Sequence, residues 1–119
     1  MDALTRHYSL FNEGVRSGDF GPWLGTFHAD AVATFTGLPI GPLHGRDQIA
    51  VAYSDHPPTS PLRVVDSSVD GDRITARFVW VDAPQTGGVL VLTLRGDKLA
   101  TMDVALDAPP PPPRLSENV

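Results

Sequence analysis

The chain has 119 residues, of which 41% are hydrophobic and 19% are charged, and this composition is typical of a single folded domain. A net charge of −5 and the lack of any cluster of lysine or arginine argue against nucleic acid or an anionic membrane as a partner. Cysteine is absent, which excludes disulfides, thiolate catalysis and zinc sites with cysteine ligands. Neither a secretory signal nor a membrane-spanning stretch is recognised, so a cytoplasmic protein is expected.

Two helices are predicted at the N-terminus. Residues 2–18 carry apolar side chains three or four positions apart, which is the pattern of an amphipathic helix: Leu4, Tyr8, Phe11 and Val15. A shorter helix capped by Asp19 is expected next, with inward side chains at Trp23, Leu24 and Phe27.

A strand, a loop and a third helix are predicted to follow. Residues 31–36 have the alternation and β-branching of a strand, and residues 37–42 form a loop with two prolines and two glycines. The third helix begins near Gly45 and ends before His56, because Pro57 disfavours helical geometry in the residue before it.

The second half of the chain is predicted to be a meander of strands. Four strands are joined by tight turns and one looser connection at 84–88, and they span residues 62–69, 73–82, 88–95 and 98–106. Helices followed by hairpins predict an α+β domain over residues 1–108, with three N-terminal helices packed on a curved, mostly antiparallel sheet that forms a cone-shaped pocket.

Residues 109–119 begin with five prolines in a row and are predicted to be a proline-rich, disordered tail outside the domain. Binding to a proline-recognition domain is the functional alternative to a solvated tail.

The alternation of side chains predicts which face of the sheet is covered. Along the predicted strand at residues 73–82, one face carries Ile74, Ala76, Phe78, Trp80 and Asp82. The opposite face of the sheet is half apolar, and it is predicted to be the interface of a homodimer that includes Thr75, Arg77, Thr93, Thr101 and Asp103.

Several local motifs resemble those of a known family. These motifs are residues 12–19, the stretch Phe27-His28-Ala29-Asp30-Ala31-Val32, Gly45-Arg46-Asp47-Gln48-Ile49 and Gly96-Asp97-Lys98-Leu99. Over residues 4–107 the chain resembles the SnoaL-like polyketide cyclase and ketosteroid isomerase branch of the nuclear transport factor two superfamily. The resemblance implies a pocket enzyme that isomerises, cyclises or hydrates a hydrophobic, polyketide- or terpenoid-like substrate.

The residues that do the chemistry in ketosteroid isomerase are not found at the matching positions. That enzyme uses an aspartate base with a tyrosine and a protonated aspartate in its oxyanion hole. The tyrosine position reads Phe11, the base position Phe35 or Thr36, and the protonated aspartate position Leu90. Tyr53 matches a tyrosine that supports the hydrogen-bond network of the isomerase.

A resemblance to limonene-type epoxide hydrolases places Asp82 in register with one of their catalytic aspartates. Their arginine and second aspartate positions read Trp80 and Val104. Asp82 is therefore the candidate acid or base, with a pKa raised by the neighbouring rings, and Tyr53 is the candidate orienting group. The alternative for Asp82 is an exposed aspartate at the end of a strand.

The pocket wall is predicted to bind a hydrophobic small molecule through apolar and aromatic side chains, which are Phe11, Trp23, Phe27, Phe35, Phe78, Trp80, Leu90 and Met102. The four histidines lack the spacing of metal ligands, so neither a metal nor another cofactor is expected. His7 is expected at the surface. Two functions remain open: a small-molecule enzyme using acid–base chemistry, and a non-catalytic dimeric protein that binds a lipophilic ligand.

Overall fold

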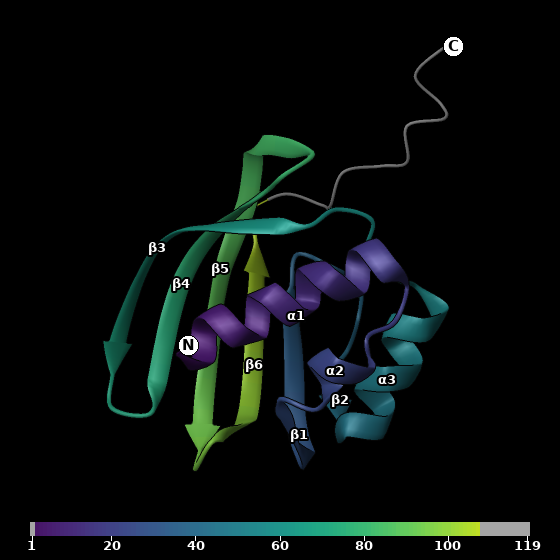
Figure 1. The fold of residues 1–119 in the computed structure, drawn as a ribbon, viewed down its shortest axis with the longest axis vertical. Helices are drawn as coiled ribbons and strands as arrows, with labels where there is room; N and C mark the ends of the chain where they lie inside the picture. Colours follow the sequence, from purple (N-terminus) through teal and green to yellow (C-terminus); the bar gives the residue numbers. More distant parts are fainter. Residues whose placement is uncertain (1, 108–119) are drawn as a thin grey trace.

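A computed structural model describes residues 2–107 of the chain, and it consists of a curved sheet with three helices against one face (Figure 1). Figure 1 shows α1 lying across the strands, with α2 and α3 beside β1. The elements in chain order are α1 (Ala3–Ser17), α2 (Gly21–Leu24), β1 (Phe27–Thr36), β2 (Leu43–His44), α3 (Arg46–Asp55), β3 (Leu62–Asp70), β4 (Arg73–Trp80), β5 (Ala83–Arg95) and β6 (Lys98–Leu106).

The strands follow the order β2-β1-β6-β5-β4-β3. All neighbours are antiparallel except β1 and β6, which run parallel. The predicted α+β fold, with its N-terminal helices and mostly antiparallel sheet, is confirmed. The predicted tail at 109–119 lies outside the described residues, and no helix of residues 2–107 is long and apolar enough to cross a membrane.

Helix α1 begins and ends at residues suited to those positions. The Asp2 side chain accepts a hydrogen bond from the Thr5 amide at 2.7 Å, and Gly18 closes the helix with a positive φ of 83°. Asn12 then ties the helix to the sheet, because its side-chain amide both donates to and accepts from the backbone of Leu62, at 2.8 Å each way. This pair of bonds fixes the height of α1 above the start of β3.

Several predicted boundaries differ from the observed ones. Helix α2 is a single turn that ends at Leu24, and Phe27 begins β1 instead of facing inward from a helix. The expected loose connection at 84–88 belongs to β5, which starts at Ala83. Strand β4 stops at Trp80, two residues before the predicted end.

The covered face of the sheet is the predicted one. On β4, Ile74, Ala76, Phe78 and Trp80 are all buried, and Leu90 and Leu92 continue this face on β5. Register shifts interrupt the pairing of β3 with β4, of β4 with β5 and of β5 with β6. Such irregularities bend a sheet, and here the bend leaves space between the sheet and the helices.

Candidate functional site

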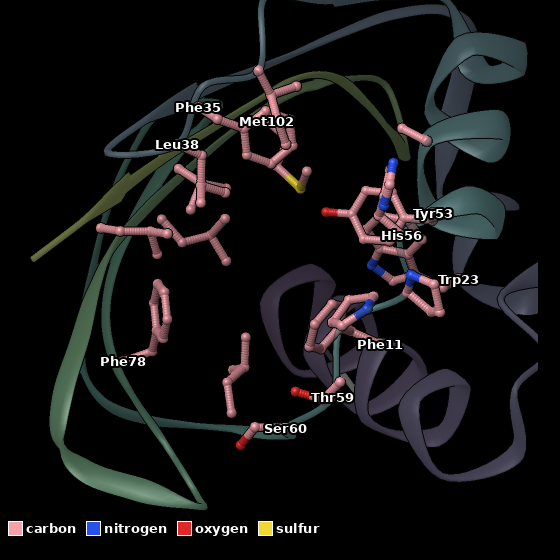
Figure 2. A pocket seen from close by; sticks show the side chains of 18 of the residues that line it. Phe11, Trp23, Phe35, Leu38, Tyr53, His56, Thr59, Ser60, Phe78 and Met102 are labelled. Carbon is pink, nitrogen blue, oxygen red and sulfur yellow. The ribbon is translucent and has the colours of Figure 1, made fainter. Parts of the chain in front are cut away.

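A cavity of about 370 Å³ lies between the helices and the inner face of the sheet. Figure 2 shows Phe11, Trp23 and Tyr53 on one side of it, facing Phe35, Phe78 and Met102 on the other. None of the described lining residues is an aspartate, glutamate, lysine or arginine. The wall therefore suits a mainly apolar and uncharged occupant, because an unpaired charge is costly to bury.

Most of the predicted wall residues line this cavity. Seven of the eight do so, together with Tyr53, and they are Phe11, Trp23, Phe35, Phe78, Trp80, Leu90 and Met102. Phe27 is the exception, because it is fully buried beneath Trp23, with the two rings 4.9 Å apart. Phe27 packs in the core and does not line the cavity, contrary to its predicted place in the wall.

Asp82 does not face the cavity. Strand β4 ends at Trp80, and the pairing shifts there, so the two-residue alternation that put Asp82 on the same face as Phe78 does not extend to it. Asp82 is exposed in the turn before β5, and it is not among the lining residues. Its backbone amide, 3.2 Å from the hydroxyl of Ser60, is its link to the cavity wall.

His7 is buried at the helix end of the cavity, which corrects its predicted surface position. Its Nε2 accepts a hydrogen bond from the Trp23 indole at 3.3 Å, which leaves the proton on Nδ1, 3.5 Å from the Thr26 hydroxyl. Burial lowers the pKa of His7 to about 3, so the ring is neutral. Because both ring nitrogens are engaged, His7 serves the structure and is not a free base.

Tyr53 presents its hydroxyl group to the cavity (Figure 2). Its ring packs on Trp23 and Phe20, at centroid distances of 4.6 and 5.7 Å, and these contacts hold the side chain in place. Burial raises the pKa of this hydroxyl above its ordinary value, so it keeps its proton. Tyr53 is thus a neutral hydroxyl group held at the cavity wall, and its role in orienting a substrate stays a prediction.

Trp80 lines the cavity at the end of β4 and is 7% exposed. Its ring meets Phe78 edge-on at 5.3 Å. The indole nitrogen is buried and has no hydrogen-bond acceptor. It is the single buried side-chain nitrogen or oxygen of residues 2–107 without a partner.

The exposed members of the wall mark its mouth. They come from the loop after β1 and from the segment between α3 and β3, and they are Ile40, His56, Pro57 and Thr59. Within the described chain, no group of three histidine, aspartate or glutamate side chains is close enough to hold a metal ion.

Residues 4–104 match the family model of the SnoaL-like domain. The chain belongs to the SnoaL-like domain family. This confirms the resemblance drawn from the sequence motifs. No match was found among curated proteins.

Solved structures with the same fold as this SnoaL-like domain share little of its sequence. A nuclear transport factor 2-like protein of unknown function from Burkholderia xenovorans LB400 has a TM-score of 0.69 and 17% identity, over 94% of this chain and 85% of that one. One from Burkholderia pseudomallei K96243 has a TM-score of 0.67 and 20% identity, over 90% and 92%. A protein with a ketosteroid isomerase-like fold from Catenulispora acidiphila, solved with trimethylamine, has a TM-score of 0.65 and 15% identity, over 82% of both chains.

Three features of the SnoaL-like domain were not predicted from the sequence, because they depend on contacts between distant segments: the burial of His7, the hydrogen bonds of Asn12 and the unpartnered nitrogen of Trp80. His7 shares a helix face with Leu4 and Phe11, three and four positions away, and that spacing was the available signal for its burial. The local sequence of Asn12 does not indicate that its side chain binds the backbone of β3. The local sequence of Trp80 does not indicate that its indole nitrogen lacks a hydrogen-bond acceptor.

Proposed function

We propose that this SnoaL-like domain binds a neutral, mainly apolar small molecule in the cavity between its helices and its sheet. The observation that carries the proposal is the wall itself, which is apolar and aromatic and has no charged aspartate, glutamate, lysine or arginine among its described members. Pockets of this size that hold small molecules are typically apolar with a few placed polar groups. Here Tyr53 supplies one such group on the helix side.

Acid–base catalysis on a polyketide- or terpenoid-like substrate is the second candidate. The Tyr53 hydroxyl supports it, because a neutral phenol inside an apolar cavity can donate a proton or a hydrogen bond to a substrate oxygen. Against it stands the position of Asp82, which is exposed and outside the wall. The binding function is therefore the first choice.

The test uses N-phenyl-1-naphthylamine, a neutral apolar dye that fluoresces in apolar sites. Ala52 lines the cavity from α3, and Val51 beside it is 60% exposed and is not part of the wall. We expect Ala52→Phe to fill the cavity and to weaken dye binding by about tenfold or more, as blocking a hydrophobic pocket does. Val51→Phe is the matched control, with the same added ring on the same helix.

Equal dye binding by the two variants, with both folded by thermal melting, would remove the cavity as the binding site. The catalytic candidate is tested separately by incubating the protein with cyclic ketones and terpene epoxides and examining the products by mass spectrometry. Turnover that disappears in Tyr53→Phe would make catalysis the first choice.

A homodimer formed through the outer face of the sheet is a further part of the proposed function. Thr75, Thr93, Thr101 and Asp103 are only partly exposed on this face, and Arg77 is exposed, 3.3 Å from Asp107. Light scattering at micromolar concentration is expected to give twice the chain mass. A monomer under those conditions would contradict the dimer.

A further inference from the structure

The indole N–H of Trp80 is a hydrogen-bond donor that the folded chain leaves unused. Leaving a buried donor without an acceptor destabilises a protein, and such groups are rare in folded proteins. Trp80 is also part of the cavity wall. An unsatisfied polar group at the wall of an apolar cavity marks a position where a ligand can supply the missing partner.

Two oxygen acceptors in the turn after β4, the Pro61 carbonyl and the Ser60 hydroxyl, take part in hydrogen bonds with other groups. The Pro61 carbonyl accepts from the amide of Val81 at 2.9 Å and from the hydroxyl of Ser60 at 2.9 Å. The Ser60 hydroxyl accepts in turn from the amide of Asp82 at 3.2 Å. These bonds hold the turn after β4 together, and neither the Pro61 carbonyl nor the Ser60 hydroxyl accepts a hydrogen bond from the indole.

We propose that the ligand of this cavity carries a neutral oxygen acceptor, a carbonyl or ether group, that accepts a hydrogen bond from Nε1 of Trp80. The inference rests on the proposed binding function and narrows it to one ligand class. The acceptor is neutral because no lysine or arginine of the described chain lines the cavity to balance an anion. Since the nitrogen is covered in the unliganded protein, binding requires the indole to turn toward the cavity that it already lines.

Acetophenone and isopropylbenzene form a matched pair of probes, because they share a shape and differ by the carbonyl oxygen. Each is titrated into the full, nitrogen-15-labelled chain while the two indole N–H resonances are followed by NMR. The Trp80 resonance, assigned by its loss in Trp80→Phe, is expected to move downfield with acetophenone and to stay nearly fixed with isopropylbenzene. The preference for acetophenone over isopropylbenzene is expected to fall about tenfold in Trp80→Phe, which is the size of one hydrogen bond.

The result that overturns the inference is binding of both probes with the same response of the Trp80 resonance and the same preference in Trp80→Phe. In that case the apolar binding function still stands. If neither probe binds while the dye of the earlier test does, the inference is overturned and the binding function stands. If the dye does not bind either, both are overturned. If Trp80→Phe does not fold, the two indole resonances are assigned in the wild type by triple-resonance NMR, and the response of the Trp80 resonance decides alone.

Discussion

The two tryptophans of this chain lie at different parts of one cavity, and they differ in what their indole groups do. Trp23, at the helix side, is 1% exposed and donates to His7, which in turn lies beside the Thr26 hydroxyl. Trp80, at the sheet side, is 7% exposed and donates to nothing in the described chain. The Trp23 indole has its hydrogen-bond acceptor within the chain, whereas the Trp80 indole has none among the described residues.

A polar group in a cavity wall that is hydrogen-bonded within the chain serves the structure, whereas one without a partner is available to a ligand. The helix side is crowded with rings, since Trp23 contacts Phe11, Phe20, Phe27 and Tyr53 at centroid distances between 4.6 and 5.9 Å. Packing and hydrogen bonding there support each other, so that side is expected to be rigid. The sheet side gains its last hydrogen bond when a ligand is present.

The largest effect is expected at Gly87, which sets the shape of the sheet side. A Cβ atom at this position would lie 1.9 Å from the carbonyl oxygen of Phe78, so β4 and β5 would have to separate. Gly87→Ala is expected to lower the free energy of unfolding by about 3 kcal/mol or more in urea denaturation. Gly41→Ala is the control, because no atom lies within 4 Å of its added Cβ. Similar stability of the two variants would mean that this close approach does not shape the wall.

The next effect is a dependence of stability on pH that arises at the helix side. His7 has a pKa of about 3 in the folded protein against an ordinary value of 6.5. Below pH 6.5 the unfolded chain therefore binds more protons, and stability falls as the pH drops toward 3. Urea denaturation is expected to show a loss of about 2 kcal/mol between pH 6.5 and 4.5.

Replacing the histidine identifies the source of that loss. His7→Gln is expected to lower stability at neutral pH and to remove most of the slope between pH 6.5 and 4.5. His44→Gln, which changes an exposed ring, is expected to keep the slope of the wild type. A slope that survives in His7→Gln would place the titrating group elsewhere.

A smaller difference is expected between the two tryptophans in the unliganded protein. Both Trp23→Phe and Trp80→Phe remove part of a buried ring, but only the first strands an acceptor, Nε2 of His7. Trp23→Phe is therefore expected to destabilise the protein by about 1–2 kcal/mol more than Trp80→Phe. Chemical denaturation measures both, and equal losses would argue that the two indoles are equivalent.

The smallest effect on stability is expected from removing residues 109–119, which lie outside the described residues. Their sequence lacks apolar periodicity, and their prolines cannot donate to a sheet. Truncation after Ala108 is expected to leave the melting temperature within a few degrees. A large decrease would show that the tail packs on the domain.

The fold could be predicted because its signals are local. The buried series Ile74, Ala76, Phe78 and Trp80 follows the two-residue period of a strand, and Leu4 and Phe11 follow the period of a helix. The parallel pairing of β1 with β6 carries no such signal, because it joins segments about seventy residues apart through contacts that neither strand encodes alone.

The apolar walls of the candidate site and the place of Tyr53 could be predicted from the sequence, whereas the place of Asp82 and the unpartnered nitrogen of Trp80 could not. Phe78, Leu90 and Met102 line the cavity as expected, because strand alternation fixes their direction. Asp82 was placed by extending that alternation beyond Trp80, where the strand ends and a turn reverses the chain. Which polar group is left without a partner depends on every neighbour in three dimensions, and sequence spacing does not report this.

The most direct test of the contrast between the two indoles is the NMR spectrum of the unliganded protein. The chemical shift of each indole proton distinguishes the two states, because a hydrogen bond moves the proton resonance downfield. The Trp23 proton, which is bonded to His7, is expected at the downfield position of a hydrogen-bonded group, and the Trp80 proton at the upfield position of a free one. Equal, downfield shifts for both protons would mean that Trp80 already has an acceptor, and the contrast between the two indoles would be wrong.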